Sequence, residues 1–203
     1  MRRLGVLVLG VVVCAAGSAS AQDTSRGEVS GGWRYYHATF SPTTATIPDH
    51  REGWYADAAF NALPMLAFVG EAGGSYSSSD FANTVNGVTA TATTDFKFHT
   101  FMGGVRLRAP FVPGIVPYGQ VLFGGEHDAT VSEQTLTVAQ RTERRRQDMN
   151  SNSAALALEA GATVMLGRIG VRASGGYARF FPTADFAVNV NAFRFSLGAA
   201  FRF

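Results

Sequence analysis

The eleven residues from Phe193 to Phe203 alternate between large apolar side chains and polar or small ones. Phenylalanine, leucine and alanine occupy one set of positions, and the other set includes Arg194 and Arg202. A period of two residues is the signature of a β-strand, whose successive side chains point to opposite faces. About eleven residues in a strand tilted by about 45° are enough to cross the apolar core of a bilayer. This pattern therefore predicts a membrane strand with lipid on one side and a narrow polar lumen on the other.

Seven further segments show the same alternation more weakly, as is usual for barrel strands. Together with the terminal segment they make eight strands, an even number that suits an antiparallel barrel. The sequence therefore predicts an all-β fold, an eight-stranded antiparallel up-and-down transmembrane β-barrel. The seven segments are residues 28–39, 53–61, 66–77, 95–108, 117–128, 152–166 and 169–180.

The connections between these segments alternate in length. Short connections that contain Pro or Gly alternate with longer polar ones, which is typical of outer-membrane barrels. An even number of strands puts both termini on the side of the short turns, so we expect both termini in the periplasm and the long loops outside the cell. The short connections are 62–65, 109–115 and 167–168, and the long ones are 40–52, 78–94, 129–151 and 181–190.

One long connection has the sequence of a structured hairpin. Asn86-Gly87 stands between two stretches of strand-forming residues, as in a two-residue type I′ turn. The third and fourth strands should therefore continue above the membrane as a ribbon, in a register that places Phe68 opposite Val105. The same register turns Phe96 and Phe98 into the lumen. To return these aromatic residues to lipid, we predict a β-bulge between Phe98 and Val105, with Gly103-Gly104 as its expected position.

The N-terminus predicts a cleaved secretory signal peptide. Two arginines precede the apolar stretch Leu4 to Ala16, and the small residues Ala19-Ser20-Ala21 follow. The apolar stretch is shorter than the roughly 20 residues that a spanning helix needs. The expected domains are a signal peptide, residues 1–21, and an outer-membrane β-barrel domain, residues 22–203. The only cysteine, Cys14, leaves with the signal, so we expect neither disulfide nor thiol chemistry.

Charge and histidine spacing restrict the partners. The net charge of +2 disappears when the two N-terminal arginines are removed, so no basic excess points to nucleic acid. The histidines show no metal-ligand spacing such as HExxH. We therefore expect no nucleic-acid partner, no cofactor, no metal site and no catalytic residues. The four histidines are His37, His50, His99 and His127.

A set of charged residues falls on the inward positions of the predicted strands. The interior of an eight-stranded barrel is just wide enough for side chains to fill. Opposite charges there should pair through charge-assisted hydrogen bonds, for which the planar guanidinium is suited. A proton or ion path through the same residues is the alternative. The residues are Asp57, Glu71, Glu126, Glu159, Arg34, Arg106, Arg172, Arg194 and Arg202.

A second group of arginines lies in the long connection 129–151. It could contact the phosphates of outer-leaflet lipopolysaccharide or an acidic partner. The alternative, which we favour, is a solvated loop tip that Glu143 and Asp148 partly balance. The arginines are Arg141, Arg144, Arg145 and Arg146.

Three stretches carry a family resemblance: the terminal strand ending in Phe203, the stretch from Phe98 to Leu107, and the stretch from Pro117 to Gly125. On these stretches the chain resembles small outer-membrane β-barrel proteins of the OmpA transmembrane-domain, OmpX and opacity-protein type, over nearly all of residues 22–203. The resemblance implies that the terminal strand is the signal recognised by the outer-membrane assembly machinery. The signal residues would be Phe193, Phe195, Leu197, Phe201 and Phe203.

Three functions remain open at this point. The favoured hypothesis is a non-enzymatic, monomeric integral barrel in outer-membrane lipid and lipopolysaccharide, with a surface-interaction or envelope-structural role through its long extracellular loops. A narrow porin-like pore or small-solute conduit is the alternative. A lipid A-modifying enzyme comes third, and its catalytic group would have to be assembled across loops, for instance His50 with Ser78 and Asp49.

Overall fold

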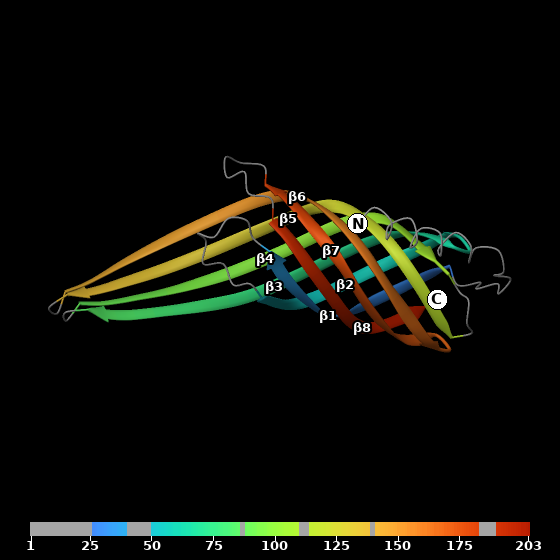
Figure 1. Cartoon of the computed structure of the whole chain (residues 1–203), viewed down its shortest axis with the longest axis horizontal. Helices are drawn as coiled ribbons and strands as arrows, with labels where there is room; N and C mark the ends of the chain where they lie inside the picture. The colour runs from blue at the N-terminus through green and yellow to red at the C-terminus, as the bar shows by residue number, and fades with distance from the viewer. Residues whose placement is uncertain (1–25, 40–49, 86–87, 110–113, 139–140, 183–189) are drawn as a thin grey trace, which may run out of the picture.

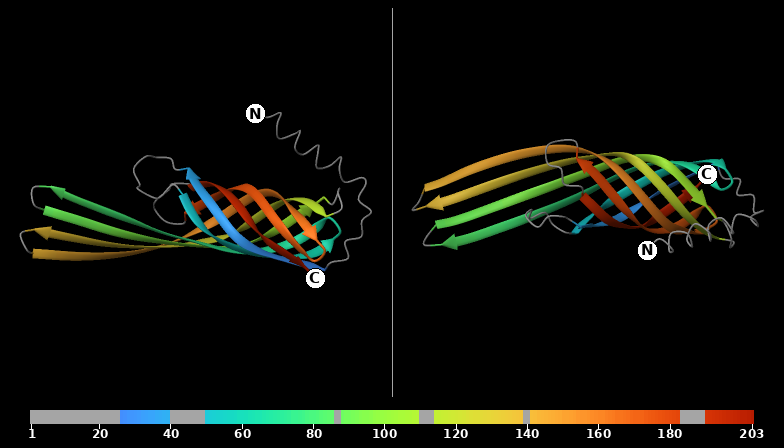
Figure 2. Two further views of the ribbon diagram at one scale, coloured as in Figure 1. Left: turned by 90° about the horizontal axis from the view of Figure 1, so that it is seen from below. Right: turned by 45° about the horizontal axis from the view of Figure 1, so that its top comes forward.

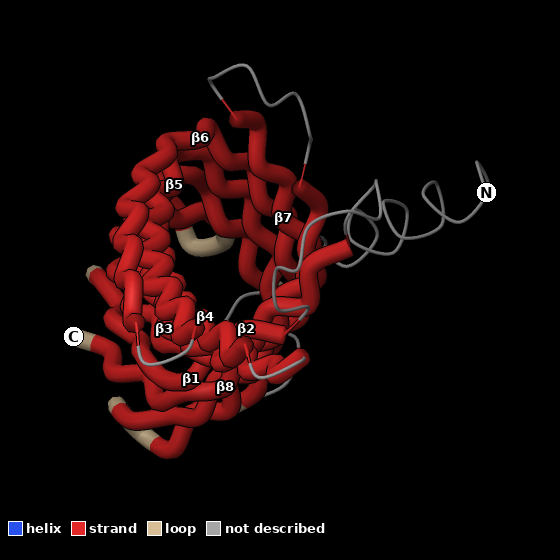
Figure 3. Tube along the Cα trace, turned by 90° about the vertical axis from the view of Figure 1, so that its left-hand side faces the viewer, coloured by secondary structure: helices blue, strands red, loops and turns tan. Residues whose placement is uncertain are grey.

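Eight antiparallel strands form a closed barrel in sequence order (Figure 1). The computed structural model describes residues 26–39, 50–85, 88–109, 114–138, 141–182 and 190–203, so the predicted signal peptide lies outside the described residues. The first and last strands pair with each other and close the ring (Figure 3). The predicted fold is therefore confirmed. The strands are β1 (Gly27–Thr39), β2 (His50–Leu63), β3 (Leu66–Val85), β4 (Val88–Arg108), β5 (Ile115–Val138), β6 (Arg141–Leu166), β7 (Ile169–Pro182) and β8 (Val190–Arg202).

The outer surface of the barrel is apolar, and charged residues are buried inside it. Large side chains such as Phe68, Phe101 and Phe123 are exposed on the outside, while Arg34 and Arg106 are buried. A contiguous apolar surface of this kind is rare on water-soluble monomers and matches the acyl chains of a bilayer. Among the described residues, no helix has the length and hydropathy to cross a membrane.

Four neighbouring strands extend well beyond the barrel (Figure 2). Strands β3 to β6 have 20, 21, 24 and 26 residues, whereas the other four have 13 or 14. Their pairing continues above the last pairs of β3 with β2 and of β6 with β7. Residues 76–85, 88–97, 129–138 and 141–150, termed the projecting sheet below, therefore form one antiparallel four-stranded sheet.

The ribbon register is confirmed and the predicted bulge is wrong. Phe68 pairs with Val105 as expected, although the turn residues Asn86-Gly87 lie outside the described residues. The pairing of β4 with β3 and with β5 runs through Gly103-Gly104 without a shift. Phe98 is consequently buried in the lumen, where it packs among other apolar side chains instead of meeting lipid.

The expected loop 129–151 is also wrong, because most of it belongs to strands. β5 and β6 stay paired as far as Val138 and Arg141. Residues 129–138 are rich in threonine and valine, which favour extended backbone. Their polarity reflects exposure to water rather than irregular structure. The expected long loops 40–52 and 181–190 are described only at their strand-forming ends, since residues 40–49 and 183–189 lie outside the described residues.

Candidate functional site

Two carboxylates and two guanidinium groups form the first ionic cluster of the lumen. Arg34 on β1 donates to both carboxylate oxygens of Glu71 on β3, at 2.7 and 2.8 Å. Arg194 on β8 donates to the same carboxylate at 3.1 and 3.4 Å and lies 2.9 Å from Glu159 on β6. All four side chains are almost completely buried. Arginines from β1 and β8 thus share carboxylates from across the barrel.

The second ionic cluster lies next to the first. Asp57 accepts from Arg172 at 2.8 and 3.0 Å and from Ser30 at 2.7 Å. Arg106 approaches Asp57 within 3.1 Å, and Glu28 within 3.4 Å. Glu28 also pairs with Arg172. This cluster joins β1, β2, β4 and β7 through side chains that are buried on every side.

Gln120 on β5 connects the two clusters. Its amide oxygen accepts from Nε of Arg106 at 2.8 Å, and its amide nitrogen donates to Glu159. Tyr118 on the same strand lies under two guanidinium groups, 4.7 Å from that of Arg106 and 5.0 Å from that of Arg172. Cation–π contacts of this kind stabilise buried guanidinium groups. The inner faces of the strands are therefore joined by one ionic network across the lumen.

An apolar compartment lies between this network and the projecting sheet. Tyr36, Phe98 and Phe180 pack edge to face, with ring centroids 5.2 and 5.6 Å apart. Small buried side chains such as Ala155 and Ala178 surround them. The rings come from β1, β4 and β7, near the ends of β1 and β7 that face the projecting sheet. The lumen is thus filled by ion pairs at mid-depth and by aromatic rings above them.

The structure places most of the predicted lumen residues in this network. Asp57, Glu71, Glu159, Arg34, Arg106, Arg172 and Arg194 are brought together as described. Arg202 is half-buried and donates to Glu28 at 2.8 Å, near the end of β8. Glu126 lies on the inner face of β5 but nearer the projecting sheet, opposite Thr100 and Ser153. It is half-buried.

Sequence reasoning missed Glu28 and Gln120 as members of the network. Both face inward, because each is separated by an even number of positions from a predicted lumen residue on its own strand, Arg34 on β1 and Glu126 on β5. Extending the alternation back to the start of β1 would have found Glu28. Gln120 carries no charge, so a search for ion pairs passed over it.

The apolar residues of the terminal strand face outward. Phe193, Phe195, Leu197 and Phe201 are exposed, and Phe203 follows the end of β8. The backbone of Phe203 exchanges hydrogen bonds with Gly27 at 3.1 and 3.2 Å. The strand therefore offers its apolar side chains to the surroundings of the barrel while its backbone pairs with β1 and β7.

The arginines expected in a loop belong to β6 in the projecting sheet, which corrects their placement. Because successive strand residues face opposite sides, Arg145 lies on one face and Arg144 and Arg146 lie on the other; the side chain of Arg141 is outside the described ones. Arg146 pairs with Asp148 at 3.0 Å and with Glu133 at 3.7 Å. Its hydrogen bond to Asp148 raises the pKa of Arg146. The arginines therefore do not form a single basic patch.

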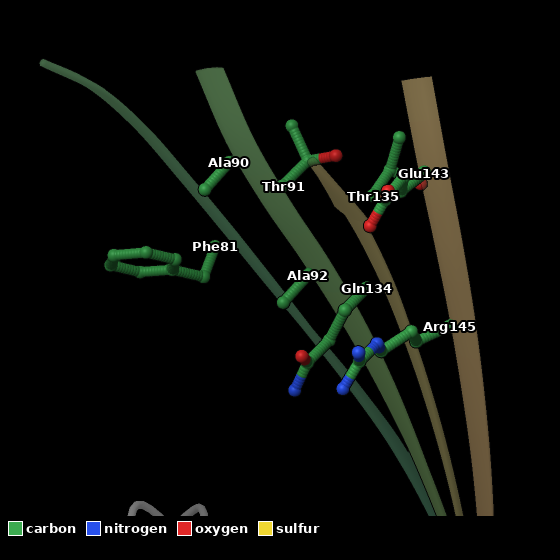
Figure 4. A pocket seen from close by; sticks show the side chains of 8 residues that line it. All are labelled: Phe81, Ala90, Thr91, Ala92, Gln134, Thr135, Glu143 and Arg145. Carbon is green, nitrogen blue, oxygen red and sulfur yellow. The ribbon is translucent and has the colours of Figure 1, made fainter. Parts of the chain in front are cut away.

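A pocket of about 470 Å³ lies on the projecting sheet (Figure 4). Cross-strand pairing places Phe81, Ala92, Gln134 and Arg145 in one row across β3 to β6. Ala92 and Gln134 have the same parity as the inward residues of the barrel, so this row lies on the face that continues the lumen wall. The pocket combines an exposed phenyl ring with two charged side chains of opposite sign and one amide side chain. The lining residues are Phe81, Ala90, Thr91, Ala92, Gln134, Thr135, Glu143 and Arg145.

In the described part of the chain, no group of three or more His, Cys, Asp or Glu side chains is arranged to hold a metal ion. Of the catalytic group considered above, Asp49 lies outside the described residues, as does the side chain of His50.

Comparison with known proteins identifies the fold. No protein-family model and no curated protein matches the sequence. The solved structure of Ail, the attachment invasion locus protein of Yersinia pestis, in complex with the heparin analogue sucrose octasulfate, is 18% identical with a TM-score of 0.53, over 87% of this chain and 97% of Ail. Neisserial surface protein A is 14% identical with a TM-score of 0.57, over 88% of this chain and 98% of that protein. The chain therefore has the fold of the small eight-stranded outer-membrane β-barrels.

Proposed function

We propose that the chain is a non-enzymatic outer-membrane protein that presents the projecting sheet outside the cell for interaction with other surfaces. In this proposal both termini face the periplasm and the apolar belt lies in outer-membrane lipid and lipopolysaccharide. The barrel acts as a monomer, and the outer-membrane assembly machinery recognises its terminal strand. The single observation that carries the proposal is the four-stranded sheet that extends beyond a filled barrel (Figure 2).

The contents of the lumen support an anchoring role for the barrel. The buried carboxylates are engaged by arginines, and the aromatic compartment lies above them. Side chains that neutralise one another across a barrel hold its strands together and fill the path that a solute would take. The membrane part then serves to hold the sheet in position.

The projecting sheet has features that suit contact with a partner. The edges formed by β3 and β6 have no neighbouring strand among the described residues. One face carries the pocket with Phe81, Gln134 and Arg145. Extended strands hold these groups more rigidly than a flexible loop would, which lowers the entropic cost of binding.

An attachment assay tests this role. Cells that display the whole chain are compared with cells that display a variant in which both projecting hairpins are shortened to the barrel rim. We expect attachment to epithelial cells or to immobilised heparin, chosen because Ail was solved with a heparin analogue, to fall to the level of cells without the protein. Folded barrel in both cell types, seen as heat-modifiable gel migration, is the control. Equal attachment by the two cell types would contradict the proposal.

Planar-bilayer recordings test the rival role as a pore. Because ion pairs and aromatic rings fill the lumen, we expect no reproducible single-channel steps from the purified protein. A general porin added to the same bilayers is the positive control. Regular conductance steps that require this protein would favour the narrow pore.

A further inference from the structure

The four histidines of the chain form two pairs, each made of residues directly opposite one another on neighbouring strands. His37 on β1 is paired with His50 on β2, and His99 on β4 is paired with His127 on β5. Directly opposed residues of antiparallel strands have Cβ atoms about 4.5–5.5 Å apart on the same face of the sheet. Both side chains are described for the pair of His99 and His127, which lies on the outer face at the foot of the projecting sheet.

The strands on either side orient the two imidazole rings. Nδ1 of His127 lies 2.8 Å from the amide oxygen of Asn152 on β6. Because an amide oxygen only accepts, Nδ1 is the donor, and the lone pair of this ring is on Nε2. A Cβ atom built on Gly74 of β3 would lie 3.1 Å from Nδ1 of His99, so that nitrogen faces β3. The two Nδ1 atoms thus face β3 and β6, the outer neighbours of β4 and β5, and each ring has Nε2 as its second nitrogen.

Two aromatic side chains pack beside His99. The ring of Tyr76 meets His99 edge on, with centroids 5.6 Å apart. Nε1 of Trp54 lies 2.7 Å from the Cβ position built on Gly74, so the indole lies beside His99. A side chain at position 74 would displace both rings, which explains why a glycine suits this position. His127 is exposed and His99 half-buried, so the pair is open to solvent on one side.

We propose that His99 and His127 together bind a divalent late transition-metal ion, such as Cu²⁺, Ni²⁺ or Zn²⁺. Imidazole nitrogen is a preferred ligand of these ions. A ligating histidine usually donates its other ring N–H to an oxygen acceptor, as His127 does to Asn152. Two protein ligands leave the remaining positions to water or to a donor from outside. Hard cations such as Mg²⁺ require oxygen ligands and are excluded from the site.

Calorimetric titration of the detergent-folded protein, without a histidine tag, tests the site. In H37Q/H50Q, His99 and His127 are the only histidines. We expect this variant to bind one equivalent of Cu²⁺ more tightly than Ni²⁺ or Zn²⁺, in the Irving–Williams order, and to give no heat with Mg²⁺. The electron paramagnetic resonance spectrum of bound Cu²⁺ should show coupling to two imidazole nitrogens.

Matched variants separate this pair from the other one. H99Q/H127Q should bind Cu²⁺ at least about 10-fold more weakly than H37Q/H50Q. Adding N152A to H37Q/H50Q should weaken its Cu²⁺ binding by about 10-fold, the size of effect known for residues that orient a ligating histidine. In W33F, Trp54 is the only tryptophan, and bound Cu²⁺ should quench its fluorescence unless His99 is replaced. Equal affinity of the two double variants, or no binding by either, would overturn the proposal.

Discussion

Replacing Glu71 with alanine is expected to lower the free energy of unfolding by about 3–5 kcal/mol, the range for breaking a buried ion pair from one side. Glu71 accepts hydrogen bonds from both Arg34 and Arg194. Without it, two guanidinium groups remain buried, and among the described residues Glu159 is the carboxylate left to compensate both. The effect is measured as a shift of the urea midpoint, with gel migration of unheated samples reporting the folded fraction.

The matched control is Glu133→Ala in the projecting sheet. Glu133 also pairs with an arginine, Arg146, but both side chains are more than half exposed. Exposed ion pairs contribute about 0–1 kcal/mol, so this variant should unfold close to the urea concentration of the original protein. If both substitutions shift the midpoint equally, the buried network does not stabilise the barrel as described.

Gly104→Val is expected to destabilise the barrel by about 1–3 kcal/mol or more, as overpacking does in other cores. A Cβ atom at Gly104 would collide with the backbone carbonyl of Val121 and lie 2.9 Å from Cα of Leu122. The collision involves backbone, so a rotamer change cannot relieve it, and β4 and β5 must separate. The measurement is again the urea midpoint, together with the yield of folded barrel.

The neighbouring glycine supplies the control. At Gly103 the nearest atom to a built Cβ is the carbonyl oxygen of Val69, at 3.8 Å, and the position faces outward. Gly103→Ala should therefore change stability by no more than about 0.5 kcal/mol, as surface substitutions usually do. If the two substitutions destabilise the barrel equally, the close approach of β4 and β5 does not explain the effect of Gly104→Val.

The barrel could be predicted from the sequence because lipid imposes a strict rule on every strand. An apolar face must meet the acyl chains, so alternation persists from Phe193 to Phe203 and, more weakly, in the other strands. The projecting sheet carries polar side chains on both of its faces between residues 129 and 150, so no apolar face imposes alternation there. Alternation is therefore lost between Ala129 and Ser151, and a strand pair there resembled a polar loop.

The interior was harder to predict than the outside. Phe98 was expected to face lipid, but the small residues Ala155 on β6 and Ala178 on β7 leave room for an aromatic ring in the lumen. The opposition of His99 and His127 depends on the register of β4 with β5, which no local spacing reveals. Contacts between strands thus carry information that alternation within one strand does not.

The pairing of β1 with β8 has a consequence for how the molecule acquires its structure. Seven of the eight pairings join strands that are adjacent along the chain, and this one joins Glu28 to Arg202. Hairpins can form early because their ends are close in sequence, whereas joining distant ends carries a large entropic penalty. Until β1 pairs with β8, each of these two strands leaves a row of amide and carbonyl groups unsatisfied, which hydrocarbon does not tolerate. Insertion and ring closure should therefore occur as one concerted event.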